Sequence, residues 1–200
     1  MAPSVKQRTL QLARRLGVLR PRDLARHGIP REYLVRLHRE GVLERPARGL
    51  YVLADAEVDE HQSLLEACKR VPRGIVCLLS ALRFHGLTTQ APFEVWIAID
   101  AKARLPKVEY PPLRIIRFSG AAQTEGIEEH VIRGATLRVT GAARTVVDCF
   151  KYRNKVGLDV ALEALRDCRK QRKATVDELC RIAQARRMLN IMRPYLEWLT

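Results

Sequence analysis

The strongest constraint on the fold lies in the first 55 residues, where three short helical segments precede a hairpin. Apolar residues recur at helical spacing in each segment. A glycine follows each one: Gly17 after residues 5–16, Gly28 after 22–27 and Gly41 after 31–40. Glycine is favoured just beyond a helix end because it adopts left-handed backbone without a steric penalty. Two β-prone runs, 42–45 and 50–53, then flank a Pro-Ala-Arg-Gly turn. This order predicts a winged helix-turn-helix domain over residues 1–55.

The remainder of the chain alternates helical and strand-like patterns. We predict helices over 61–70, 75–84, 142–152, 158–168, 176–187 and 195–199, and strands over 94–99, 113–118, 130–133 and 136–139. The acidic stretch 54–60 is predicted to be a linker. The fold class is therefore α+β: an N-terminal winged helix-turn-helix followed by a larger mixed α/β domain, residues 61–200, with a helical C-terminal tail.

The charge favours a polyanionic partner. The chain of 200 residues carries 36 Lys and Arg against 22 Asp and Glu, a net charge of +14. Residues 1–55 hold 12 basic and 5 acidic residues, a net charge of +7. Such an excess is typical of nucleic-acid binding. The alternative is a surface generally rich in arginine with no such partner.

Several classes of protein are disfavoured. No apolar stretch approaches the length of a membrane span, and residues 1–15 lack the apolar core of a secretory signal. The five cysteines include no C-x-x-C pair, which argues against a zinc ribbon or a disulfide framework. We therefore expect a cytoplasmic protein without a membrane partner, a metal site or a cofactor.

The third predicted helix has the pattern of a recognition helix. Leu34 and Leu37 share one face with Gly41, while Arg36 and Arg39 lie nearly opposite. Arginine can bond guanine in the major groove or clamp a phosphate. The alternative is a solvated face with ion pairs between Arg36 and its glutamate neighbours.

Other basic residues are predicted to hold the DNA rather than read it. Arg31 near the start of the helix, and Arg45 and Arg48 beside the hairpin turn, are placed for backbone or minor-groove contact. Lys6, Arg8 and Arg22 are expected to add non-specific attraction. The predicted partner is double-stranded operator or promoter DNA.

The hairpin carries a recognisable motif. Gly41-Val42-Leu43-Glu44-Arg45 followed by Arg48-Gly49-Leu50-Tyr51 resembles the G-x-L-x-R…R-G-x-Y signature of the AbiEi family of antitoxins, from type IV toxin–antitoxin and phage-defence systems. Residues 79–87, 95–99 and 144–148 follow in the family's order. The resemblance spans residues 5–170. It implies a winged helix that represses its own operon and a C-terminal domain needed to counteract a nucleotidyltransferase-like toxin.

Enzymatic alternatives have weaker support. Asp100-Ala101-Lys102 ends an apolar strand and mimics half of a restriction-type nuclease site, so a nuclease with a winged-helix targeting domain is the alternative function. That chemistry needs a second carboxylate on a neighbouring strand. His85 is expected to be a packed histidine, and Arg144 an ion-pair partner of Asp148 four residues later. We predict no catalytic residue. A third hypothesis is a toxin-binding module that has lost operator binding.

Overall fold

A computed structural model describes residues 3–55 and 61–198, and these form two compact units. The first unit comprises Met1–Pro72, Pro106–Pro112 and His130–Leu137, and the second Arg73–Leu105, Leu113–Glu129 and Arg138–Thr200. Most of the predicted linker lies outside the described residues. The proposed domain boundary between residues 55 and 61 stays a prediction.

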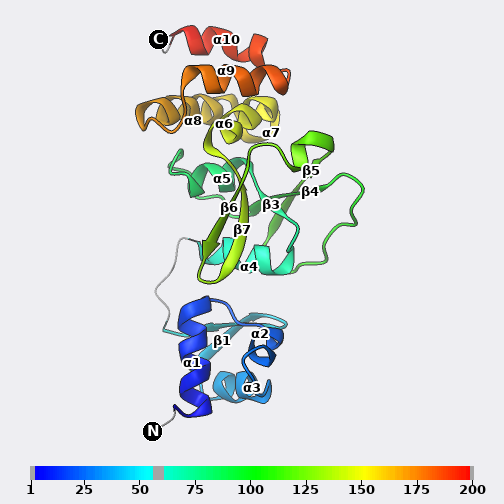
Figure 1. The fold of residues 1–200 in the computed structure, drawn as a ribbon, viewed down its shortest axis with the longest axis vertical. Coiled ribbons are helices and arrows are strands. Elements are labelled where there is room, and N and C mark those ends of the chain that lie inside the picture. Colours follow the sequence, from blue (N-terminus) through cyan, green and yellow to red (C-terminus); the bar gives the residue numbers. More distant parts are fainter. Residues whose placement is uncertain (1–2, 56–60, 199–200) are drawn as a thin grey trace. The chain divides into compact units, whose positions relative to one another are not determined.

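The first unit contains the predicted winged helix (Figure 1). Its elements are α1 (Val5–Leu16), α2 (Pro21–Ala25), α3 (Glu32–Arg39), β1 (Leu43–Ala47) and β2 (Leu50–Leu53), and α4 (Gln62–Arg70) also belongs to this unit. Ser4 and Gln7 form a capping box at the start of α1. Leu19 and Tyr51 exchange backbone hydrogen bonds of 2.8 and 3.0 Å, which adds a third short strand segment to the hairpin.

A separate apolar core supports the winged helix. Leu34 and Leu37 of α3 are almost fully buried against Leu12 of α1, Leu24 of α2 and Tyr51 of β2. Burial of each such side chain contributes about 1.5–3 kcal/mol. The core is composed of residues that precede the end of β2, so this part of the chain has its own source of stability.

Five strands among the described residues form one mixed sheet, in the order β5-β4-β3-β7-β6. They are β3 (Ile75–Val76), β4 (Val95–Asp100), β5 (Leu113–Phe118), β6 (Ile127–Ile132) and β7 (Ala135–Thr140). β3 pairs antiparallel with β4 and parallel with β7, and β4 pairs parallel with β5. The short strand β3 therefore lies at the centre of the sheet.

Helices of the second unit share one core with the sheet. They are α5 (Leu78–Phe84), η1 (Gly120–Gln123), α6 (Ala142–Lys151), α7 (Arg153–Val156), α8 (Leu158–Lys170), α9 (Val176–Ala185) and α10 (Leu189–Trp198). Phe118 of β5 and Phe150 of α6 are among the largest fully buried side chains of this core. Figure 1 shows α6 and α8 side by side, α9 packed next to them and α10 beyond α9. The predicted helical tail is confirmed.

Two predicted elements differ from the structure in kind or position, and the strand expected over 130–133 begins earlier, as β6 (Ile127–Ile132). The helix expected over 75–84 is split, because Ile75 and Val76 pair with β4 and β7 and only Leu78–Phe84 is helical. The last helix begins at Leu189, upstream of Pro194, rather than after it. Proline removes one helical hydrogen bond, but the buried Met192 and Leu196 still hold α10 on the core.

The cysteines have the character of core residues. Cys68, Cys77, Cys149 and Cys168 are buried, Cys180 is partly exposed, and all five are free thiols. Burial raises the pKa of Cys168 to about 11. No group of three His, Cys, Asp or Glu side chains able to hold a metal occurs within residues 3–55 and 61–198. No helix in the same part of the chain has the length and apolar character to cross a membrane.

Candidate nucleic-acid interface

Helix α3 is anchored on one side and basic on the other. Leu34 and Leu37 lie in the core, and His38 Nδ1 lies 2.9 Å from the carbonyl oxygen of Leu43, which ties α3 to β1. Arg36 and Arg39 are exposed, and Arg31 is exposed at the N-cap position. The structure therefore brings the predicted reading residues to the solvent side of α3.

A glutamate at the end of α3 holds two of the predicted DNA-binding residues. Glu40 accepts from Lys6 Nζ at 2.6 Å and from Arg36 Nε at 3.0 Å. These hydrogen bonds, that of Lys6 foremost, keep the pKa of Glu40 below its usual value. The ion pair that was the alternative interpretation of Arg36 is thus present. Because the Arg36 side chain stays 66% exposed, pairing does not remove it from solvent.

Four other predicted residues have side chains without a hydrogen bond or ion pair in the described part of the chain. They are Arg22, Arg31, Arg39 and Arg48, and all are exposed. A long unpaired cation on a surface can reach a phosphate without first breaking an internal contact. Arg8 differs, because its Nη2 donates to the carbonyl oxygen of His27 at 2.7 Å.

The hairpin turn has the composition of a basic wing. Gly49 has a φ of 74°, a left-handed conformation that favours glycine. The guanidinium of Arg45 lies 5.9 Å from the centre of the Tyr51 ring, within cation–π range. Tyr51 is itself buried, so it fixes Arg45 beside the turn while Arg48 remains exposed at its tip.

The residues of the alternative nuclease hypothesis are engaged in loop contacts. Asp100 Oδ1 accepts from the backbone N–H of Lys102 at 2.6 Å, and Oδ2 accepts from Gln123 Nε2 at 2.5 Å. The Lys102 bond is the main reason that the pKa of Asp100 is lowered. Glu94, on the same chain segment, lies 3.6 Å from Arg114 in an ion pair. This arrangement is that of a capped strand end.

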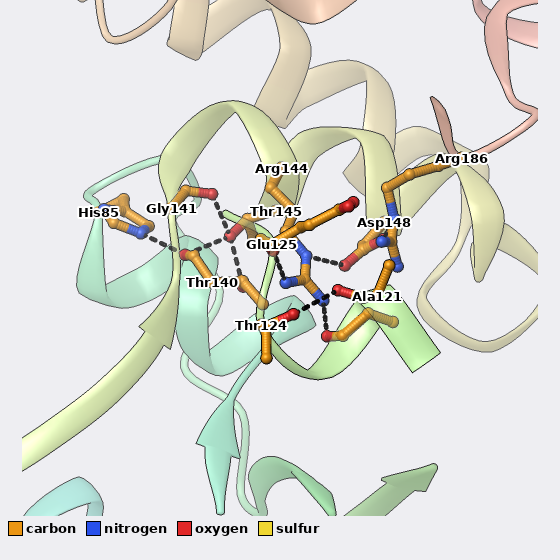
Figure 2. Close-up of polar contacts among 11 residues, drawn as sticks. His85, Ala121, Thr124, Glu125, Thr140, Gly141, Arg144, Thr145, Asp148 and Arg186 are labelled. Carbon is orange, nitrogen blue, oxygen red and sulfur yellow. Dashed lines mark hydrogen bonds and ion pairs between the residues drawn. The ribbon is translucent and has the colours of Figure 1, made fainter. Parts of the chain in front are cut away.

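A buried ionic cluster occupies the second unit (Figure 2). Asp148 is fully buried, with Arg144 Nε at 3.2 Å from one carboxylate oxygen and Arg186 Nε at 2.5 Å from the other. Arg144 also donates to the carbonyl oxygens of Ala122 and Glu125 and lies 5.0 Å above the Phe118 ring. The predicted pair of Arg144 and Asp148 is confirmed. The cluster joins α6 to α9 and to the chain after β5.

Arg186 was not singled out by sequence reasoning. It lies 38 positions from Asp148, and spacing rules along one helix cannot connect residues so far apart. His85 is a packed histidine, with Nε2 2.8 Å from the carbonyl oxygen of Thr140. Thr145 Oγ1 bonds the same carbonyl oxygen at 2.8 Å, so the start of α6 is fixed by polar contacts (Figure 2).

Comparison with known proteins finds similarity to a protein family and to a solved structure. Residues 7–54 match the protein family described as "Transcriptional regulator, AbiEi antitoxin". The crystal structure of RV2827C protein from Mycobacterium tuberculosis is similar, with a TM-score of 0.62 over 92% of this chain and 72% of that chain. At 20% sequence identity, this likeness concerns the fold alone. No curated protein sequence matches the chain.

Proposed function

We propose, from the premise that residues 7–54 belong to the AbiEi antitoxin transcriptional regulator family, that this chain represses its own operon and counteracts a nucleotidyltransferase-like toxin. In this proposal the winged helix binds operator DNA, and the second domain, residues 61–200, supplies the antitoxin activity. The chain acts in the cytoplasm and catalyses no reaction. The family, a regulator family, supports DNA as the partner. The existence of a toxin partner, and its counteraction by this chain, go beyond the family match and are part of our proposal.

One observation carries the proposal of DNA binding. Arg39 on α3 and Arg48 on the wing are exposed and unpaired among the described residues, while Leu34 and Leu37 bury the opposite face of α3. A helix fixed in this way can enter the major groove, and the wing can contact the neighbouring backbone. Arg31, Arg22 and Arg48 hold phosphates in this scheme, and Arg36 and Arg39 read base edges.

The test is binding of the full chain to its own promoter. We expect a labelled promoter duplex to bind at least tenfold more tightly than a scrambled duplex of equal length and composition, measured by fluorescence anisotropy at a fixed salt concentration. Equal affinity for both duplexes would contradict operator recognition. Absence of binding to either would instead favour a toxin-binding module that has lost operator binding.

A second measurement addresses the nuclease alternative. The same duplexes, incubated with the chain and Mg²⁺ or Mn²⁺, should remain intact because Asp100 bonds to Lys102 and Gln123. Metal-dependent cleavage that Asp100→Asn abolishes would overturn the proposal that the chain is not an enzyme.

A further inference from the structure

A basic pocket lies wholly within the second unit, and no residue of the candidate nucleic-acid interface lines it. It has a volume of about 340 Å³ and is lined by the chain after β5 and by the ends of α6 and α9. The lining includes four cationic side chains and one carboxylate: Arg117, Lys151, Arg186, Arg187 and Glu125. This is a formal excess of three positive charges. Concave surfaces of one charge sign concentrate counter-ions of the other.

Arg186 is held in place at the pocket wall. Its Nε donates to the buried carboxylate of Asp148 at 2.5 Å, and Figure 2 shows the two side chains facing each other beside Arg144. Since Asp148 already bonds Arg144, one carboxylate serves two guanidinium groups. The remaining N–H groups of Arg186 form no hydrogen bond to any residue that the structure describes. A cation oriented in advance loses little freedom when it binds an anion.

Two further cations on the lining have side chains without a partner in the described part of the chain. The side chains of Lys151, at the end of α6, and Arg187, just after α9, make no hydrogen bond or ion pair within residues 3–55 and 61–198. Tyr152, a half-buried residue of the lining, adds a hydroxyl group that can donate or accept. The fourth cation, Arg117, donates to the carbonyl oxygens of Asp100, Ala101 and Ala103, so it contributes charge from a fixed position.

We propose that this pocket is a phosphate-binding site, in which Lys151, Arg186 and Arg187 bind the terminal phosphate of a small molecule. A phosphate dianion offsets two of the three excess charges and offers several acceptor oxygens, whereas a carboxylate offsets one charge. The volume is that of a small-ligand site, large enough for free phosphate or a nucleoside phosphate. Both share the same terminal phosphate chemistry. The inference does not depend on DNA binding.

The backbone conformation at Arg187 favours glycine, so a glycine substitution can test the role of this cation in phosphate binding without disturbing the fold. Arg187 follows the end of α9 with a φ of 58°, and its N–H and that of Met188 bond back to Gln184 and Ala183. Arg172 follows the end of α8 with a φ of 55°, and its N–H and that of Lys173 bond back in the same pattern. Glycine is the preferred residue at both positions. Arg172 does not line the pocket, so it is a matched control.

The experiment is isothermal titration calorimetry of the full chain with inorganic phosphate and with ATP at constant ionic strength. We expect Arg187→Gly and Lys151→Gln each to weaken phosphate binding about tenfold. Arg172→Gly and the exposed Lys170→Gln should leave binding unchanged. Glu125→Gln should strengthen it severalfold, because it removes the carboxylate from the lining. Both glycine variants should have a raised Tm, so loss of binding in one of them cannot be attributed to unfolding.

The comparison of the two ligands identifies the class of ligand, and a variant of the winged helix shows whether binding occurs at the pocket. Tighter binding of ATP than of inorganic phosphate would support the site and identify nucleoside phosphates as its ligands; equal binding would support it with free phosphate as the ligand. The same titration with Arg36, Arg39, Arg45 and Arg48 all changed to alanine should give the same affinities, because these residues lie outside the pocket. Absence of binding at millimolar phosphate and ATP, or equal weakening by Arg187→Gly and Arg172→Gly, would overturn the proposal.

Discussion

Arg36 and Arg39 lie on the same helix but are not equivalent donors. Arg36 donates its Nε–H to Glu40, so a contact with DNA competes with that ion pair, whereas Arg39 has no internal partner among the described residues. We therefore predict that Arg39→Ala weakens promoter binding by about 1–3 kcal/mol and reduces discrimination against scrambled DNA. Arg36→Ala should weaken promoter binding less than Arg39→Ala does. The ion pair between Arg36 and Glu40 competes with the DNA contact, so the net contribution of Arg36 to binding is smaller. Fluorescence anisotropy on both duplexes measures the two effects.

A control separates reading from general attraction. Arg166→Ala removes an exposed cation of α8 that has no partner among the described residues, and it should leave promoter preference intact. If Arg39→Ala keeps the full preference for the promoter, α3 is not the reading helix.

The buried carboxylate of Asp148 is the residue on which the second unit most depends. Asp148→Asn would leave the buried Arg144 and the partly buried Arg186 without a compensating charge. We expect a loss of about 3–5 kcal/mol in the free energy of unfolding, measured by urea denaturation. Asp177→Asn, which changes an exposed carboxylate in the first turn of α9, should cost below about 1 kcal/mol. Similar losses in both variants would show that the buried ion cluster stabilises the second unit no more than an exposed carboxylate does.

At the scale of elements, the winged helix is predicted to bind DNA on its own. Its core is made from residues before the end of β2, so a fragment of residues 1–55 should fold and keep most non-specific affinity. If four to six of its basic side chains contact phosphates, the logarithm of affinity should fall with that of salt concentration at a slope of about −4 to −5. Anisotropy titrations at several salt concentrations measure this slope. A slope near zero would reject the electrostatic contacts.

Sequence reasoning located well the elements whose signals lie within a single segment of the chain. Helix α1 was predicted at its observed bounds because its apolar spacing and Gly17 are signals within one segment. The failures have non-local causes. β3 is a strand because β4 and β7 lie on either side of it, although its residues also fit a helix. Pro194 is accommodated inside α10 because the buried Met192 and Leu196 hold the helix.

The candidate site, like the fold, was predictable from the sequence only where the cause is local. Exposure of Arg36 and Arg39 followed from the helical period of Leu34 and Leu37. The bond from Lys6 to Glu40 did not, because it joins residues 34 positions apart through the packing of α1 on α3. Arg186 escaped notice for the same reason, since its partner Asp148 is defined only by how α9 packs on α6.

At the scale of the whole molecule, the proposed repression and toxin counteraction are predicted to be separable. Changing Arg36, Arg39, Arg45 and Arg48 together to alanine removes exposed charge and no core atom, so the fold should survive. That variant should fail to repress its promoter yet still protect cells against a cognate toxin expressed from an unrelated promoter. Residues 1–60 alone should bind DNA and give no protection. A promoter-reporter assay and toxin-induced growth arrest, scored in one strain, measure both activities.

The control for this separation is a variant with the opposite defect. Asp148→Asn disrupts the buried ion cluster of the second unit and leaves the winged-helix core untouched. It should keep DNA binding while protection falls, because it destabilises the domain that is proposed to act against the toxin. If the four-arginine variant loses protection while circular dichroism shows that it is folded, the winged helix must itself be part of the surface that counteracts the toxin, and the assignment of one activity to each domain would be wrong.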